Sequence, residues 1–294
     1  MTMNRIAVTC LIALGAANAA AEEVDKTLDA AADGLVEVSN VSGSVEIRGW
    51  SRKQVEVKGD LGRDVDELIF ERDGNHVTIR VEAKHRNMRN ISSDLVIRVP
   101  EKSAVRVGTV SADITVRDVL GEQTLNTVSG DIDIEGAEGD LDIQTVSGDV
   151  DVSANGTAVD SRFETVSGDI DVEKLAGDVN ATTVSGDINL LNGNFGRARI
   201  NTTNGDMTFR SALAEDGRLD IDTINGEVDI RFRGKVSARF DIETFNGDIN
   251  NCFGPEPVRT SKYTPGRELN FTEGGGKGRV TIHTLNGDLE LCKD

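Results

Sequence analysis

Aromatic residues are scarce in this sequence: its 294 residues include one Trp, one Tyr and nine Phe. Proteins that stack nucleic-acid bases or bind sugars on aromatic platforms need more such side chains, so the composition disfavours both classes. Positive charge is also short, because 51 Asp and Glu face 32 Lys and Arg and give a formal net charge of -19. Such an acidic body repels nucleic acid and anionic membranes, and we expect no nucleic-acid partner.

Long apolar runs are missing after residue 21, so we expect no transmembrane segment. The first residues differ, because Arg5, the apolar run 6–17 and small residues up to Ala21 predict a secretory signal peptide over residues 1–21. We therefore expect an exported protein that is periplasmic or associated with the cell envelope, or is secreted. The His residues are scattered, and the chain lacks a phosphate-binding loop and a dinucleotide fingerprint, so we expect no cofactor and no catalytic residues.

One phrase repeats through most of the chain. It reads Thr, apolar, Ser or Asn, Gly, acid, as in Thr127-Val128-Ser129-Gly130-Asp131, and an apolar/polar alternation follows it. The steps between successive glycines are 18, 20, 18, 19, 21 and 21 residues. A regular period of this length predicts a repeat protein in which each unit buries its apolar face against its neighbours. The glycines are Gly130, Gly148, Gly168, Gly186, Gly205, Gly226 and Gly247.

Each repeat has room for two short strands, and the chain after the signal peptide has no convincing helix. We predict an all-β fold, a right-handed parallel β-solenoid (β-helix) with coils of ~18–21 residues. The solenoid repeats should cover 104–294, after a polar leader at 22–33 and an N-terminal β cap with opening coils at 34–103. Strand alternation predicts an interior that contains Ile132, Ile134, Val150, Val152, Ile170, Val172, Ile188 and Leu190.

An antiparallel β meander is the alternative, because Asn225-Gly226 between alternating strands is also a hairpin signal. The apolar residue before each Ser or Asn distinguishes the two folds. A hairpin would expose this residue, whereas a solenoid corner can turn it inward, and we favour the solenoid for that reason. Stacked Ser or Asn at the corner should then bond along the stack, as amide ladders do. The seven residues expected inward are Val128, Val146, Val166, Val184, Ile224, Phe245 and Leu285.

The residues also carry a family resemblance. Ile97-Arg98-Val99-Pro100, then residues 109–114 and the run of Val-Ser-Gly-Asp phrases, resemble the bacterial DUF4097 family over about residues 35–291. That family carries the label of adhesin. The resemblance implies a β-solenoid exported to the cell envelope, and it offers no catalytic residues to carry over.

Acidic residues follow the glycines and suggest two further functions. Neighbouring coils lie ~4.8 Å apart, so a divalent ion would relieve repulsion among stacked acids, and a calcium-binding repeat protein is one alternative. A polysaccharide-active β-helix enzyme is the other. It would need one distinct acid pair, whereas these acids are near-equivalent copies. The weak calcium candidates are Asp131, Asp149, Asp169 and Asp187.

The favoured function is a non-enzymatic scaffold that presents an acidic β-surface for adhesion or interaction. Its partner would be a surface protein or glycan of the envelope, and the sequence does not indicate an oligomeric state. Residues 253–278 break the repeat rhythm with three prolines and a Gly-Gly-Gly run, and they predict a long inserted loop. We expect its basic and aromatic side chains to contribute to partner contact: Arg259, Lys262, Tyr263 and Arg267.

The repeat register predicts a disulfide between Cys252 and Cys292. Cys252 lies five residues after Gly247, and Cys292 lies five after Gly287. If the loop leaves and rejoins neighbouring coils, the two cysteines are ~4.8 Å apart, within disulfide range. If the protein is exported, the disulfide would persist, because the compartments outside the cytoplasm are oxidising. It should pin the final coil, which has almost no sequence left to cover its edge.

Overall fold

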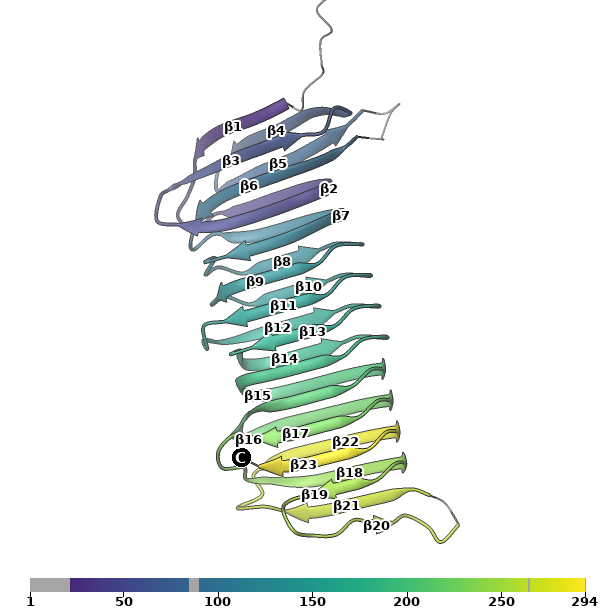
Figure 1. Ribbon diagram of the computed structural model, residues 1–294. Helices are drawn as coiled ribbons and strands as arrows, with labels where there is room; N and C mark the ends of the chain where they lie inside the picture. The colour runs from purple at the N-terminus through teal and green to yellow at the C-terminus, as the bar shows by residue number, and fades with distance from the viewer. Residues whose placement is uncertain (1–21, 85–89, 264, 294) are drawn as a thin grey trace, which may run out of the picture.

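The computed structural model describes residues 22–84, 90–263 and 265–293. In these ranges the chain forms 23 β-strands and no helix, and the strands join in one hydrogen-bonded sheet. Figure 1 shows this sheet wound into an elongated stack of coils. The predicted signal peptide, residues 1–21, lies outside the described residues.

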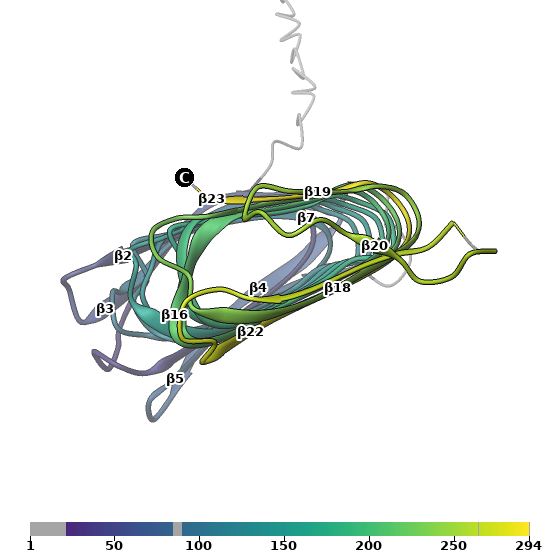
Figure 2. The ribbon, with the colours of Figure 1, turned by 90° about the horizontal axis from the view of Figure 1, so that it is seen from below.

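The middle of the stack consists of regular coils, each with two walls. Figure 2, a view along the stack, shows the flattened cross-section. The first wall contains β8, β10, β12 and β14, and the second wall contains β9, β11 and β13, while β7, β15 and β16 run through a corner and enter both. The strands are β7 Ala104–Arg117, β8 Gln123–Asn126, β9 Ile132–Ala137, β10 Leu141–Gln144, β11 Val150–Ala154, β12 Ala158–Glu164, β13 Ile170–Glu173, β14 Ala176–Thr182, β15 Ile188–Asn204 and β16 Met207–Asn225.

All pairing between these coils is parallel and in register. Val150 pairs with Ile132 on one side and with Ile170 on the other. Met207 pairs with Val228 in the same parallel sense, so Asn225-Gly226 joins two walls and closes no hairpin. The parallel solenoid-like arrangement is confirmed, and the antiparallel meander is wrong.

The core lies between the two walls. The eight side chains predicted for the interior are at most 3% exposed. Parallel pairing places each of them against its equivalents in the coils above and below, so the apolar positions form continuous columns. This is how units too small to form a core alone share one.

The corner differs from the prediction. The apolar side chains before each Ser or Asn point outward and are 45–49% exposed, from Val166 at 45% to Val128 at 49%. The preceding threonines, such as Thr183 at 2%, occupy the interior instead. Strand alternation continues into the corner and turns the next residue to solvent. Glycine is needed because the coils approach closely there: a Cβ on Gly148 would lie 2.1 Å from the carbonyl oxygen of Gly130.

The N-terminal end of the stack is built out of chain order. β2 pairs in parallel with β7 on one side and with β5 and β6 on the other, so the first long strand lies inside the stack. β1 then covers the edge of β3 in antiparallel pairing, so residues 22–29 are a strand and the predicted polar leader is corrected. The strands are β1 Glu22–Asp29, β2 Leu35–Trp50, β3 Gln54–Leu61, β4 Val65–Asp73, β5 His76–Ala83 and β6 Ser92–Pro100.

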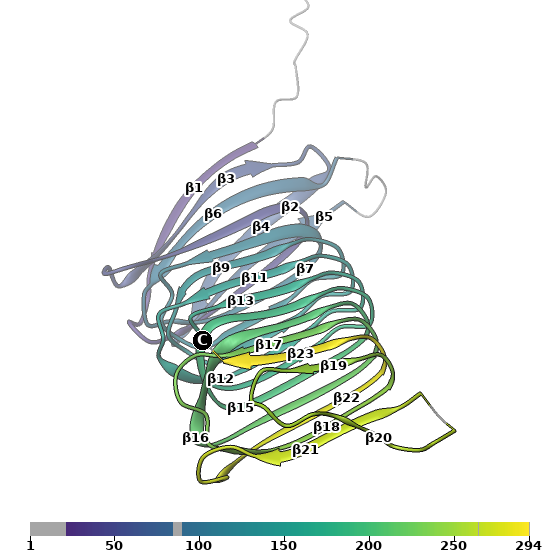
Figure 3. The same cartoon turned by 60° about the horizontal axis from the view of Figure 1, so that its bottom comes forward.

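The C-terminal end shows the same inversion. The final coil, β22 and β23, lies between the coil of β16 and β17 and the coil of β18 and β19 (Figure 3). The end of the stack is therefore β18, which β21 covers in antiparallel pairing. The strands are β17 Val228–Phe232, β18 Ala238–Asn246, β19 Ile249–Asn251, β20 Val258–Arg259, β21 Arg267–Thr272, β22 Gly278–Asn286 and β23 Leu289–Lys293.

Two expectations about this end are corrected. The predicted inserted loop, 253–278, contains the strand that caps the stack, and Phe271 stacks on Phe240 with ring centroids 4.4 Å apart. The final coil is covered on both sides and is not an exposed edge. The physical reason is the same for both: an open parallel edge leaves unpaired backbone groups, and the chain supplies a strand for each edge.

A charge placed in a core column should be severely destabilising. We expect Ile170→Asp to lower the free energy of unfolding by more than about 4 kcal/mol, because it buries an unpaired carboxylate at a position that is 0% exposed. Chemical denaturation measures this, with the exposed Thr157→Asp on the same stack as the control. A loss below about 1 kcal/mol, as for a surface substitution, would contradict the described core.

Candidate interaction surface

The corners that carry the repeat phrase form the outer edge of the stack on the right in Figure 1, and apolar side chains are exposed there. Eight of them are half-exposed, from Val166 at 45% to Val110 at 50%, and Thr203 occupies a ninth equivalent position. Hollows of about 500 Å³ and about 430 Å³ lie beside the two ends of this file. We name the eight side chains the apolar ladder: Val110, Val128, Val146, Val166, Val184, Ile224, Phe245 and Leu285.

The corner beneath the ladder is held by stacked amides and hydroxyls. The Nδ2 atoms of Asn246, Asn286 and Asn225 each donate to the Oδ1 of the next Asn along the stack, ending at Asn204, all at 2.8 Å. This confirms the expected asparagine ladder. The serine corners pair through backbone bridges, as Ser129 does with Ser147. These bonds fix the position along the stack axis from which each ladder side chain projects.

A file of carboxylates runs next to the ladder on the second wall. The backbone N–H of Asp149 donates to Oδ1 of Asp131 at 3.0 Å, and the same bond recurs from Asp169 to Asp149 at 2.9 Å and from Asp187 to Asp169 at 2.7 Å. The four calcium candidates thus lie in one file, where each bonds to a neighbouring coil. Among the described residues no group of three or more His, Cys, Asp or Glu is arranged to hold a metal ion. Calcium binding stays a prediction.

A second acidic file, Asp133, Asp151 and Asp171, lies two residues further along the same strands. Burial raises the pKa of the Asp151 carboxyl above its usual value of 3.8, and repulsion from Asp171, Asp133 and the nearer acids of the first file raises it further. Ionised Asp151 therefore disfavours the folded state.

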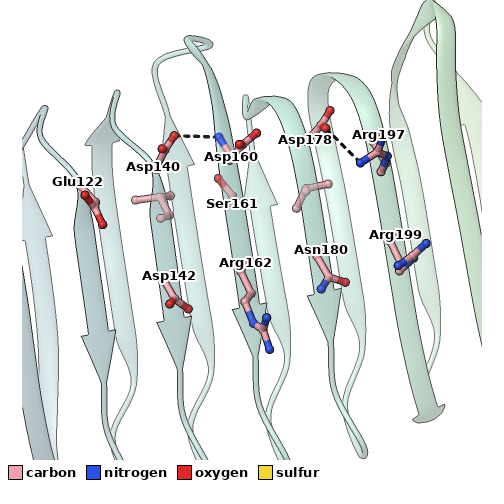
Figure 4. A pocket seen from close by; sticks show the side chains of 12 residues that line it. Glu122, Asp140, Asp142, Asp160, Ser161, Arg162, Asp178, Asn180, Arg197 and Arg199 are labelled. Carbon is pink, nitrogen blue, oxygen red and sulfur yellow. Dashed lines mark hydrogen bonds and ion pairs between the residues drawn. The ribbon is translucent and has the colours of Figure 1, made fainter.

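The first wall carries a shallow hollow of about 430 Å³, shown in Figure 4. Its lining has five acidic and three basic side chains, with Leu141, Ser161, Val179 and Asn180 among them, and includes no aromatic ring. Several of its acids occupy equivalent positions on neighbouring strands, as Asp160 and Asp178 do. The hollow therefore does not have the sugar platform and the distinct acid pair that a polysaccharide-active enzyme needs.

The predicted contact residues of 253–278 have different surroundings. Arg267 pairs with Asp248 at 2.6 Å and ties the cap to the corner. Tyr263 is 88% exposed at the tip, and the Lys262 ammonium lies 5.8 Å from its ring centroid. Arg259 lies on β20, which pairs with β21. The segment is thus a cap with a protruding tip, and its contact with a partner remains a prediction.

The disulfide between Cys252 and Cys292 is present, with Cα atoms 4.9 Å apart. The backbone N–H of Cys252 also donates to the carbonyl oxygen of Leu291 at 2.9 Å. The bond joins the coil at the end of the stack to the inserted final coil. It therefore fastens the coil that enters last in sequence to the coil that the cap covers.

Comparison with known proteins assigns the family. The family model described as Toastrack DUF4097 matches residues 35–208 and 176–292. The chain belongs to the DUF4097 family. The Val-Ser-Gly-Asp phrases that carried the resemblance are the corners of the DUF4097 coils described above. A search of the curated proteins gives no match.

Solved structures similar to this DUF4097 protein share little sequence with it. A “putative adhesin” from Parabacteroides distasonis is 14% identical, with 92% of this chain and 98% of that chain covered and a TM-score of 0.49. A “putative lipid binding protein” from the same organism is 12% identical, with 93% and 98% covered and a TM-score of 0.47. A “putative adhesin” from Bacteroides fragilis is 10% identical, with 92% and 97% covered and a TM-score of 0.42. Likenesses this weak add nothing to the family assignment.

The described part of this DUF4097 protein contains no helix with the length and apolar character of a membrane span.

The apolar ladder was not predicted from the sequence, because the prediction assumed that the corner turns the apolar residue inward. Its signal was present: the apolar residue follows a Thr that takes the inward place, and strict alternation then predicts exposure.

The second acidic file makes the stability of the fold depend on pH, and replacing one of its carboxylates by an amide tests this dependence. We expect Asp151→Asn to raise the stability of the fold at neutral pH, because it removes a carboxylate whose pKa is raised in the folded state. The gain should shrink as the pH falls through the raised pKa and vanish below 3.8, where the folded and unfolded carboxyls are both protonated. Denaturation across this pH range measures it. A gain that persists at the acidic end would contradict the assigned cause.

Loss of the disulfide should loosen the C-terminal end. The bond closes a loop with a sequence separation of 40 residues, so the chain-entropy model gives a loss of about 3 to 4 kcal/mol for Cys252→Ser with Cys292→Ser. Chemical denaturation measures the loss, and reductant should have no effect on the double variant. Two free thiols in the oxidised protein, labelled under denaturing conditions, would contradict the bond.

Proposed function

We propose that the protein is a non-enzymatic scaffold of the adhesin kind, which binds its partner along the apolar ladder. One observation carries this: eight half-exposed apolar side chains form a single file on the outer edge of the stack. With coils spaced ~4.8 Å apart, the file from Val110 to Phe245 is about 38 Å long. Thr203 is the one interruption within this length, and large exposed apolar patches on soluble proteins mark interaction sites.

The surroundings of the ladder give the partner's chemistry. On the second wall the corner acids, Asp131 among them, are exposed beside the ladder. An extended partner that presents apolar groups in a row, with cations along one side, fits this pattern better than a neutral glycan does. A surface protein of the envelope is therefore the partner class that we favour over a glycan.

Export to the cell envelope belongs to the same proposal. The Cys252–Cys292 bond supports it, because disulfides persist in oxidising compartments such as the periplasm. The net charge of -19 gives the scaffold its acidic surface. We also infer a right-handed coil, since connections between parallel strands are right-handed in nearly all cases.

The ladder can be tested without disturbing the core. Val128→Thr, Val146→Thr and Val166→Thr together keep β-branched side chains at the corner, as Thr203 does naturally. We expect the triple variant to bind isolated cell envelopes at least about tenfold more weakly, a loss of only about 1.4 kcal/mol over three sites. Its melting temperature should be unchanged.

A reverse change provides the matched control. Thr203→Val fills the gap between Val184 and Ile224 and should strengthen envelope binding, because it makes the ladder continuous. Binding of purified, oxidised protein to envelope fractions, by sedimentation, measures both variants. If the triple variant melts early and binds normally, the ladder serves the stability of the stack and the proposal is wrong.

A further inference from the structure

Charged side chains on the first wall form one file that changes sign halfway along the stack. Backbone register places its members at equivalent positions along eight neighbouring strands, where Glu122 and Asp140 immediately precede their strands. The first four are acids and the last four are arginines, and Figure 4 shows the first five of them side by side. We name this the charge file: Glu122, Asp140, Asp160, Asp178, Arg197, Arg218, Arg279 and Arg239.

The fold creates the basic half of the charge file. In sequence Arg279 lies 40 residues after Arg239, but insertion of the final coil places it between Arg218 and Arg239. With Arg279 in this place, four arginines follow one another along the stack, in a protein whose net charge is -19. The pattern has no counterpart in the repeat phrase.

Most members of the charge file lack a partner within the chain. Arg197 pairs with Asp178 at 3.8 Å, where the sign changes. Within the described part of the chain, Arg218, Arg279 and Arg239 make no side-chain hydrogen bond or ion pair, and the carboxylates of Glu122 and Asp160 make none. Like charges directly opposite on neighbouring strands destabilise a sheet, and here they lie ~4.8 Å apart. Each half therefore needs opposite charge from outside.

We propose that this face binds a second copy of the chain in antiparallel orientation. A twofold axis parallel to the strands, placed between Asp178 and Arg197, reverses the file and sets each acid against an arginine. Asp160 then faces the partner's Arg218, and Asp178 faces the partner's Arg197. The contact is isologous and closed, so it gives a dimer and no filament.

The neighbouring file on the same wall agrees with this symmetry. It reads Asp142, Arg162, Asn180, Arg199, Asp220 along the stack. The same axis sets Arg162 against the partner's Asp220 and Asn180 against the partner's Arg199, so no like charges meet. The next file, nearer the corner, would set Glu164 against the partner's Asp222, so the contact ends before it.

The hollows of this wall leave room for the partner's side chains. One of about 430 Å³ lies over the acidic half, with Asp140 and Asp160 in its lining. Another of about 880 Å³ lies over the basic half, with Arg218, Arg239 and Arg279 in its lining. A long side chain from each copy can therefore enter the half of opposite sign.

Other occupants satisfy only half of the surface. A polyanion would reach the four arginines and be repelled by the four acids, and a polycation would do the reverse. Eight positions at ~4.8 Å cover about 34 Å, and a strip two files wide falls at the small end of specific interfaces. We therefore expect a weak dimer that dissociates at about 1 M salt, where the Debye length is ~3 Å.

A charge swap tests both the contact and its register. In Asp160→Arg, the new arginine faces the partner's Arg218, and in Arg218→Asp the new acid faces the partner's Asp160. Each single variant should weaken dimerisation at least about tenfold, because two symmetric ion pairs become repulsive. The double variant restores opposite charges, and so does an equimolar mixture of the two single variants, which should form a heterodimer. Sedimentation equilibrium of the oxidised mature protein at low and high salt measures all four.

The controls reverse exposed charges that lie outside the charge file, beyond its N-terminal end. Arg63→Asp and Asp66→Arg lie near the N-terminal end and should leave dimerisation unchanged, and melting curves should show that every variant is folded. A wild-type chain that stays monomeric at low salt would overturn the proposal. Single variants that dimerise normally, or a mixture that stays monomeric when each single variant does, would overturn the interface or its register. Weakened binding of heparin to Arg218→Asp without rescue of dimerisation in the double variant would assign the arginines to a polyanion instead.

Discussion

Parallel, in-register hydrogen bonding between coils governs the core, the ends and the surface of this protein. It fixes a spacing of ~4.8 Å and sets each side chain against its equivalents above and below. A residue type that recurs at one position of the repeat therefore forms a column along the stack. Apolar columns form the core, asparagines form an amide ladder, and aspartates bond to the backbone of the next coil. Glycine stands at the corner because neighbouring coils meet there backbone to backbone.

The same constraint makes the two ends of the stack a problem, because an open parallel edge invites another strand. The chain solves it by leaving sequence order at both ends. β2 lies inside the stack, and β1 and β3 to β6 extend outward from it. The final coil enters between two earlier coils. Six of the nine phenylalanines form one series of ring contacts that leads to the C-terminal end, and the disulfide fastens the inserted coil there. Most of the few aromatic side chains thus close the core toward its C-terminal end.

Columns also explain why the surface of the described residues is organised in strips. The apolar ladder, the acidic files and the charge file run along the stack, each one residue wide. A strip of repeated groups suits contact with an extended partner or with another stack, because many weak, equivalent contacts add along its length. Catalysis would require one position to differ from its neighbours, and in-register repetition works against this.

The repeat period was enough to predict the all-β class, the parallel stacking, the interior columns and the Cys252–Cys292 pair, because all of these follow from a period in one dimension. Other features depend on contacts between segments that the period does not encode. The outward turn of Val128 and its equivalents depended on how Thr fills the corner. The strands found in 22–29 and 267–272 depended on edges that needed covering. The four successive arginines exist only because the final coil enters between two others, and spatial order there departs from chain order.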